Sequence, residues 1–140
     1  MDIIRLCAWG YAVLLGFVIV SGYIPAFIDQ NDMILGLFKR TWYADGLHLV
    51  SALWAAIAAL ISRRAAELFF KLFGVFYFAD GVMGLITGSG YLDFGIVING
   101  WLNLPLQTRI FANLPHLVLG GTAILIGYAL APRTRPAAHA

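Results

Sequence analysis

Hydrophobic and polar positions divide the chain into four long apolar runs joined by shorter polar segments. The runs extend from about Ile3 to Ile24, from Ala44 to Ile61, from Leu68 to Thr87 and from Leu114 to Leu130. A helix that crosses a bilayer needs roughly 20 predominantly apolar residues, so each run predicts a membrane-spanning helix. The first run is longer than the apolar region of a signal peptide and no small-residue cleavage site follows it, which favours a retained span.

Composition supports this prediction, because 61% of the residues are hydrophobic and only 11% are charged. The net charge of +2 provides no basic face for nucleic acid, and the single cysteine, Cys7, excludes an internal disulfide. The expected fold class is therefore all-α, an integral membrane four-helix bundle whose first partner is the lipid bilayer. We expect a single four-span domain over residues 1–131 and a disordered, Pro/Ala-rich cytoplasmic tail over residues 132–140.

The basic residues predict the orientation of the four spans. Six of the nine lie in the N-terminal segment, the connection between the second and third spans, or the C-terminal segment: Arg5, Arg63, Arg64, Lys71, Arg133 and Arg135. With four spans these three segments share one side of the membrane, which the positive-inside rule assigns to the cytoplasm. The sequence thus predicts a multi-pass protein of a bacterial inner membrane with both termini in the cytoplasm.

The sequence matches itself when residue i is placed beside residue i+68. Ser21-Gly22-Tyr23 meets Ser89-Gly90-Tyr91, and His48-Leu49-Val50 meets His116-Leu117-Val118. Because one offset covers helix, loop and helix, it predicts two helix-loop-helix repeats, at about residues 6–62 and 74–130. Each repeat crosses the membrane twice, so the repeats are parallel, unlike the inverted repeats of many transporters.

Each half of the chain carries Gly-Tyr-Ile/Leu, a loop, and a helix that opens with His three residues after Asp or Asn. These residues are Asp45-Gly46-Leu47-His48, followed by Ser51-Ala52, and Asn113-Leu114-Pro115-His116, followed by Gly120-Gly121. Over about residues 5–130 this pattern resembles a bacterial four-helix membrane family known as domain of unknown function number 4383. The resemblance implies the same four-helix architecture and carries no assigned chemistry.

His48 and His116 are the first candidate site, since a histidine inside a span is costly and needs a partner. Loop pinning or hydrogen bonding between helices is one interpretation, and we expect each ring to bond the loop of its own repeat. The alternatives are ligation of haem b or a metal ion, or a role in binding a proton or substrate. No cysteine pair or dense carboxylate cluster supplies further metal ligands, so no metal site and no required cofactor are predicted.

Asp80 is the one carboxylate predicted well inside a span, and it should face the bundle. Thr122 is predicted at a similar depth as its hydrogen-bond partner. Asp45 and Asn113, each three residues before a histidine, match helix N-cap or first-turn positions, and Asp45 could also orient His48.

Small residues in the third and fourth spans, including Gly84 and Gly88, predict close helix packing within the chain or a contact between copies. The leading functional hypothesis is a non-enzymatic accessory, scaffold or oligomer-forming subunit, as a homo-oligomer or within a larger membrane complex. The second is a b-type haem or quinone-binding protein that uses His48 and His116. The third is a small-solute or proton-coupled carrier around Asp80.

Overall fold

The computed structural model describes residues 1–36 and 38–134, and it is a bundle of four long helices. α1 spans Ile3–Ser21, α2 Trp42–Ile61, α3 Arg63–Thr87 and α5 Leu106–Leu125. All four, the last extended to Arg133, are long and apolar enough to cross a membrane. The predicted all-α membrane bundle is therefore confirmed as a fold.

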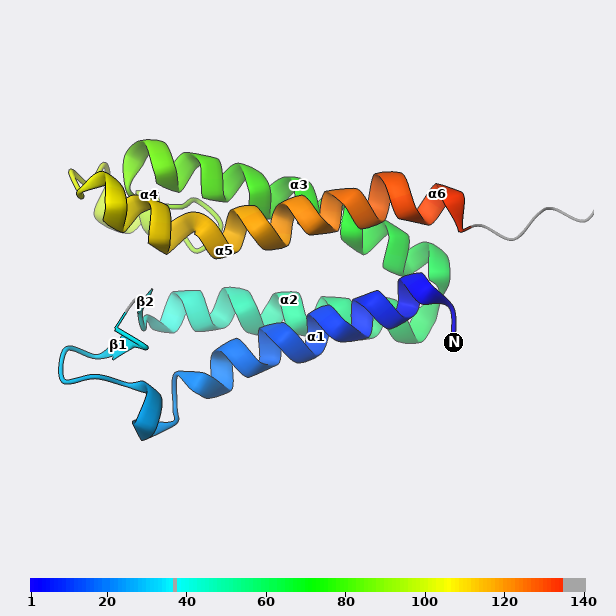
Figure 1. The fold of residues 1–140 in the computed structure, drawn as a ribbon, viewed down its shortest axis with the longest axis horizontal. Helices are drawn as coiled ribbons and strands as arrows, with labels where there is room; N and C mark the ends of the chain where they lie inside the picture. The colour runs from blue at the N-terminus through cyan, green and yellow to red at the C-terminus, as the bar shows by residue number, and fades with distance from the viewer. Residues whose placement is uncertain (37, 135–140) are drawn as a thin grey trace, which may run out of the picture.

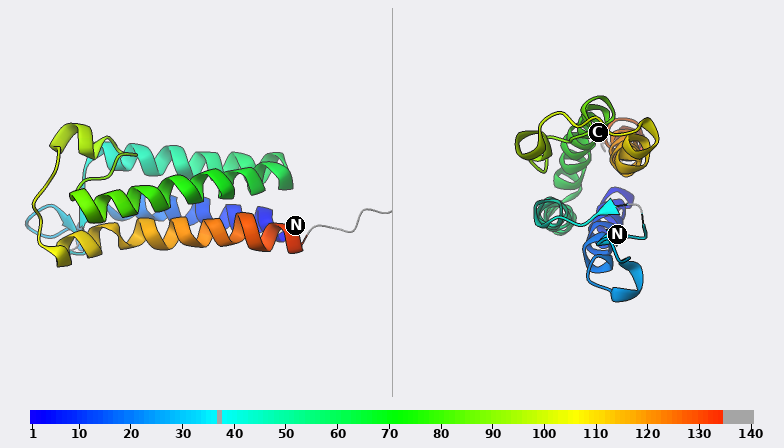
Figure 2. Two further views of the ribbon diagram at one scale, coloured as in Figure 1. Left: turned by 90° about the horizontal axis from the view of Figure 1, so that it is seen from above. Right: turned by 90° about the vertical axis from the view of Figure 1, so that its left-hand side faces the viewer.

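Two helical hairpins form the bundle, and they lie side by side. α1 pairs with α2, and α3 pairs with α5, as both views show (Figures 1 and 2). The N-terminus, the C-terminal end of the fourth span and the α2–α3 junction lie at one end, here called the terminal end, and the connections within each hairpin lie at the other, the loop end (Figure 1). α1 and α3 both run toward the loop end, which is the direction that parallel repeats require. Common descent of the two hairpins stays a prediction.

Side-chain caps fix where three of the helices begin. Asp2 accepts a hydrogen bond from the Ile4 amide at 3.0 Å, Thr41 from Ala44 at 3.3 Å and Ser62 from Ala65 at 3.1 Å. Each cap satisfies one of the amides that the first helical turn leaves free. Because Ser62 caps α3, that helix begins at Arg63 and not at Leu68 as the apolar run suggested.

The fourth span begins at Leu106, not at Leu114, because polar residues at its start are compatible with a helix that Pro105 opens. Beyond α5 the helix continues through a π-helical segment, η2 (Ile126–Leu130), into α6 (Ala131–Arg133). Helix therefore extends into the first residues of the predicted disordered tail. Residues 135–140 of that tail lie outside the described residues.

The two connections at the loop end differ in structure. The first contains a 3-10 turn, η1 (Pro25–Phe27), and two short antiparallel strands, β1 (Met33–Ile34) and β2 (Phe38–Lys39). The second contains the short helix α4 (Gly95–Asn99). Trp42 and Trp101 are 82% and 67% exposed at this end.

Aromatic side chains fill the core between the hairpins near its middle. Tyr11 of α1 packs edge-on against three phenylalanines of α3, at 5.1 Å from Phe70 and 5.5 Å from Phe73. Its hydroxyl donates to the Leu119 carbonyl of α5 at 2.8 Å, so this one residue contacts both helices of the other hairpin. Trp54 of α2 joins the same cluster.

Candidate functional site

Asp80 lies in α3 with only 1% of its surface exposed, so the prediction that it faces the bundle interior is confirmed. The segment after α3 folds back toward it. The carboxylate atom Oδ1 accepts hydrogen bonds from the amides of Tyr91 at 2.6 Å and Leu92 at 2.8 Å. These two bonds satisfy main-chain amides that no helix or strand would pair.

Gly90 allows this approach, because a Cβ there would lie 2.8 Å from both carboxylate oxygens of Asp80. The returning segment is also held by the Tyr91 hydroxyl, which donates to the Phe76 carbonyl at 2.8 Å. Burial raises the pKa of Tyr91, so its hydroxyl remains a donor. The result is a short segment that returns after α3 and covers the buried carboxylate.

His116 of α5 provides the third hydrogen-bond partner of this carboxylate. Its Nδ1 lies 2.6 Å from Oδ2 of Asp80. Hydrogen bonds from two main-chain amides favour the charged form of a carboxyl group, so we assign Asp80 as the ionised acceptor and place the proton of the contact on Nδ1. The predicted bond between His116 and its own loop is therefore wrong in its direct form, since the ring reaches the loop only through Asp80.

Thr122 is not the partner of Asp80, and that prediction is wrong. The acceptor atoms of Asp80 meet His116 and the loop amides, and Thr122 is exposed on the surface of α5. Nothing in the sequence indicates that a loop returns to Asp80, so matching depth favours a partner on the neighbouring helix. In the structure the loop itself supplies two donors.

His48 approaches the pair from the other hairpin. Its ring centroid lies 6.3 Å from that of His116, with the ring planes at 83°. The internal repeat predicted that the two histidines occupy related positions, and the fold brings them together across the bundle. Asp45 and Asp93 lie within electrostatic range of His48.

A cavity of about 560 Å³ opens at the loop end between the hairpins. Five of the six candidate residues line it: Asp45, His48, Asp80, Asn113 and His116. Thr122 does not belong to this lining. Ligand pockets of about 300–1,000 Å³ with an apolar lining and a few convergent polar groups are the usual form of a small-molecule site.

Asp45 and Asn113 have different roles from each other. Asp45 lies in the first turn of α2, as predicted, where it accepts a hydrogen bond from the Tyr23 hydroxyl at 3.1 Å. Asn113 is not an N-cap, because α5 begins at Leu106 and encloses it. Its side-chain amide donates to the Arg109 carbonyl at 2.9 Å, on the face of α5 that packs against Gly84 of α3.

Three polar residues near the site, Tyr77, Ser51 and Ser89, are not among the predicted site residues. Tyr77 lies with its ring 5.2 Å from that of His116 and its hydroxyl 2.7 Å from Ser51 Oγ of α2. Ser89 is buried in the cavity lining, and its Oγ has no hydrogen-bond partner among the described residues. The repetition of Ser21-Gly22-Tyr23 as Ser89-Gly90-Tyr91 was the available signal for Ser89.

Metal chemistry has limited support. Within residues 1–36 and 38–134 no three His, Cys, Asp or Glu side chains form a group that could hold a metal ion. The two imidazoles remain the candidate ligands for a haem iron.

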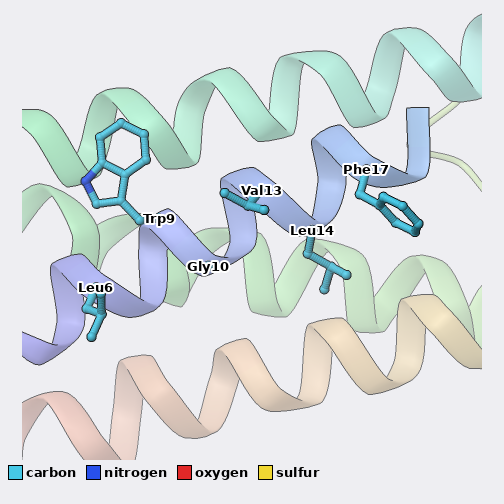
Figure 3. Close-up of a pocket in the computed structure, with 6 residues that line it drawn as sticks. All are labelled: Leu6, Trp9, Gly10, Val13, Leu14 and Phe17. Carbon is cyan, nitrogen blue, oxygen red and sulfur yellow. The ribbon is translucent and has the colours of Figure 1, made fainter. Parts of the chain in front are cut away.

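A separate shallow hollow runs along α1 (Figure 3). Its lining comes from that helix alone: Leu6, Trp9, Gly10, Val13, Leu14 and Phe17. None of these side chains is ionisable, so the hollow fits contact with lipid chains and carries no chemistry.

Comparison with protein-family models, with curated proteins and with solved structures finds no match to this chain. The resemblance to the family of unknown function number 4383 therefore stays a prediction. Any functional conclusion must come from the geometry of the cavity.

Proposed function

We propose that this membrane protein binds a small lipophilic ligand of the quinone type in the cavity at its loop end. One observation carries the proposal: His48 and His116, from different hairpins, meet at a mostly apolar cavity, and His116 is oriented by a buried carboxylate. Hydrogen-bonding groups fixed at the edge of an apolar cavity suit a ring with polar substituents. This is the second of the three hypotheses that the sequence supported.

Ligation of b-type haem is the second candidate, because two imidazoles can hold a haem iron, whereas among the described residues no third His, Cys, Asp or Glu joins them to form a metal site. Metal–imidazole bonds are about 2.0–2.1 Å long. His48 and His116, whose ring centroids lie 6.3 Å apart, would hold such an iron and would supply its nitrogen ligands. The carboxylate behind His116 is the kind of outer partner that orients a ligating imidazole.

The other two hypotheses have less support from the geometry. Asp80 accepts three hydrogen bonds, which favours a fixed structural charge over a carboxylate that a carrier cycle would have to release. An accessory role, in a homo-oligomer or a larger complex, is compatible with ligand binding and is retained as part of the proposal.

We also propose the predicted orientation, with both termini in the cytoplasm of a bacterium and the cavity near the outer face of its inner membrane. Arg5, Arg63, Arg64, Lys71 and Arg133 all belong to the terminal half of the bundle, in keeping with the positive-inside rule. A reporter fused after Ala140 that is active only outside the cytoplasm would contradict this orientation.

The binding proposal is tested with the purified protein in nanodiscs. We expect saturable quenching of tryptophan fluorescence by a short-chain quinone, weakened about tenfold or more in His116→Ala. His139→Ala is the matched control, since it removes the remaining histidine of the chain and should leave the affinity unchanged. A Soret band after addition of haem, lost in His48→Ala and in His116→Ala, would replace quinone by haem. The absence of both signals would overturn the proposal.

A further inference from the structure

The hydrogen bonds around Asp80 leave one nitrogen of His116 to act on a ligand. Oδ1 of Asp80 accepts hydrogen bonds from two main-chain amides, and Oδ2 accepts one from Nδ1 of His116. With Nδ1 committed as a donor, Nε2 of a neutral His116 carries a lone pair. An imidazole oriented by a carboxylate in this way is an effective proton acceptor, because the carboxylate stabilises the imidazolium that forms.

We infer that the ligand bears a weakly acidic hydroxyl group, as a phenol or hydroquinone does, and that Nε2 of His116 accepts its proton. This inference rests on the proposed function, because it names the chemistry of the ligand in the same cavity. On transfer the O–H bond breaks and an N–H bond forms at Nε2. The electron pair stays on the ligand oxygen, and the imidazolium retains its Nδ1–H bond to Asp80, so no electron is exchanged.

The charges around the imidazoles favour a ligand that enters as a neutral molecule. Asp80 and the Tyr77 phenol face His116 from α3, and Asp45 of α2 and Asp93 of the second loop lie near His48. Lys39 and Arg40 are the cations of the lining, and Arg40 already lies 3.8 Å from Asp32. A strong acid is an anion in water and would lose its hydration in a largely apolar cavity beside carboxylates, whereas a phenol enters uncharged.

Two further groups of the lining could form hydrogen bonds with the ligand. They could bind its second oxygen, or the oxygen that becomes negatively charged when the proton is transferred. Ser89 is 6% exposed, lies in the cavity lining and has a hydroxyl without a partner among the described residues. His48 faces His116 across the cavity at 6.3 Å between centroids. A buried donor that the protein leaves unpaired is costly unless something else satisfies it.

The test uses p-nitrophenol, whose phenolate absorbs visible light, with the protein in nanodiscs and empty nanodiscs as the blank. At a pH one unit below the pKa of the free probe, about one tenth of it is ionised. We expect more than half of the bound probe to be ionised. His116→Gln should still bind the probe, detected by tryptophan quenching, but should lose this shift. Glu67→Gln, which changes another buried carboxylate of α3, should keep it.

The outcomes separate this inference from the proposed function. Quenching by p-nitrophenol without a phenolate shift in the wild-type protein overturns the inference while ligand binding stands. Visible Co²⁺ absorption bands that require both His48 and His116 and that disappear on adding the probe would assign the imidazoles to a metal, which also overturns it. No quenching by p-nitrophenol or by a quinone removes both proposals. Because the absence of a shift in the wild-type protein overturns the inference by itself, the test does not depend on a variant that folds poorly.

Discussion

The two hairpins share an order of elements and a self-matching sequence, yet they pack differently. In the α3–α5 hairpin, a Cβ on Gly81 would lie 2.9 Å from the Leu117 side chain, and one on Gly120 would lie 2.8 Å from Cα of Phe78 and would also meet its backbone nitrogen. In the α1–α2 hairpin, Gly10 and Gly16 have open space where a Cβ would be. Gly81 and Gly120 therefore permit a close helix contact, whereas Gly10 and Gly16 have no such packing role.

The sequence register shows how this difference arises. At the offset of 68 residues, Gly81 corresponds to Val13 and Gly120 to Ala52, so the second hairpin has the smaller residue at each contact. Asp80 corresponds to Ala12, so the second hairpin alone has the buried carboxylate at this level. The close packing of α3 and α5 brings His116 to Asp80, and the first hairpin adds His48 from across the cavity. One hairpin thus builds the site and the other covers it.

Among the substitutions that test this difference between the hairpins, Asp80→Ala is expected to lower the free energy of unfolding most. The change leaves two loop amides and Nδ1 of His116 without their acceptor, and breaking a buried charged pair costs about 3–5 kcal/mol. The measurement is the free energy of unfolding in mixed detergent micelles. His116→Ala should be destabilising too, and the double variant should lose less than the sum because the two residues share one contact.

The control is Glu67→Gln in the same helix. Glu67 pairs with Lys71 at 2.9 Å near the terminal end, away from the returning loop. If Asp80→Ala were no more destabilising than Glu67→Gln, the carboxylate would not be what closes the loop end.

Adding one methyl group to one glycine of each hairpin tests the packing difference directly. Gly120→Ala is expected to cost about 1–3 kcal/mol, because the new Cβ meets backbone that cannot move away easily. Gly16→Ala should be neutral or stabilising by up to about 1 kcal/mol, since it fills open space and alanine is the better helix former. Equal effects of the two substitutions on thermal unfolding would show that the hairpins pack alike.

Much of the fold could be predicted because bilayer spans need long apolar runs, and four such runs are visible. The helix starts were less predictable, since end turns accept polar residues such as Arg63 and Arg109. Arg109 illustrates the difficulty. It precedes the apolar run that begins at Leu114, but it lies in α5 and donates to the Leu85 and Ile86 carbonyls at 3.0 Å, at the end of α3. Such bonds satisfy carbonyls that the helix end leaves free.

The residues of the site could be predicted from the sequence, but the hydrogen bonds that join them could not. His48, His116 and Asp80 are conspicuous because ionisable groups are costly inside spans. Their pairing depends on the rotation of α5 against α3 and on main-chain amides of Tyr91 and Leu92. Main-chain donors carry no residue signature, so the returning loop and the correct partner of Asp80 could not be found. The N-cap position predicted for Asn113 is wrong for a related reason. It requires a helix that begins near Leu114, whereas α5 begins at Leu106, directly after Pro105.

The hairpins are also joined by single hydrogen bonds, and Tyr11→Phe tests one of them. The variant keeps the aromatic packing of α1 on α3 and removes the bond from the hydroxyl to the Leu119 carbonyl. A hydrogen bond of this kind contributes about 1 kcal/mol. We expect a loss of that size in the free energy of unfolding. A loss as large as that of Asp80→Ala would mean that the contact between the hairpins, and not the closed loop end, dominates stability.

The smallest expected effect lies at the terminal end, where Asp2 of the first hairpin pairs with Arg63 of the second. Arg63 also donates to the Ala131 carbonyl and the Thr134 hydroxyl, so it links three segments. Partial burial acts to raise the pKa of Asp2, but hydrogen bonds from Arg63 and the Ile4 amide outweigh it and hold the pKa below the ordinary value of 3.8. A partly exposed pair of this kind contributes about 0–1 kcal/mol.

The sign of the pH dependence follows from that lowered pKa. A carboxyl whose pKa is lower in the folded state stabilises the fold above its unfolded pKa, here 3.8. The contribution is lost as the pH falls through the folded value, because protonation then removes the charge that attracts Arg63. The difference in unfolding free energy between wild type and Asp2→Asn should therefore be constant near neutral pH and shrink below pH 3.8. Arg64→Gln provides the matched control, since it removes a neighbouring cation but leaves Asp2 and Arg63 in place. A difference that grew on acidification would show that Asp2 is stabilised in its neutral form, and the terminal end would then be held by contacts other than this ion pair.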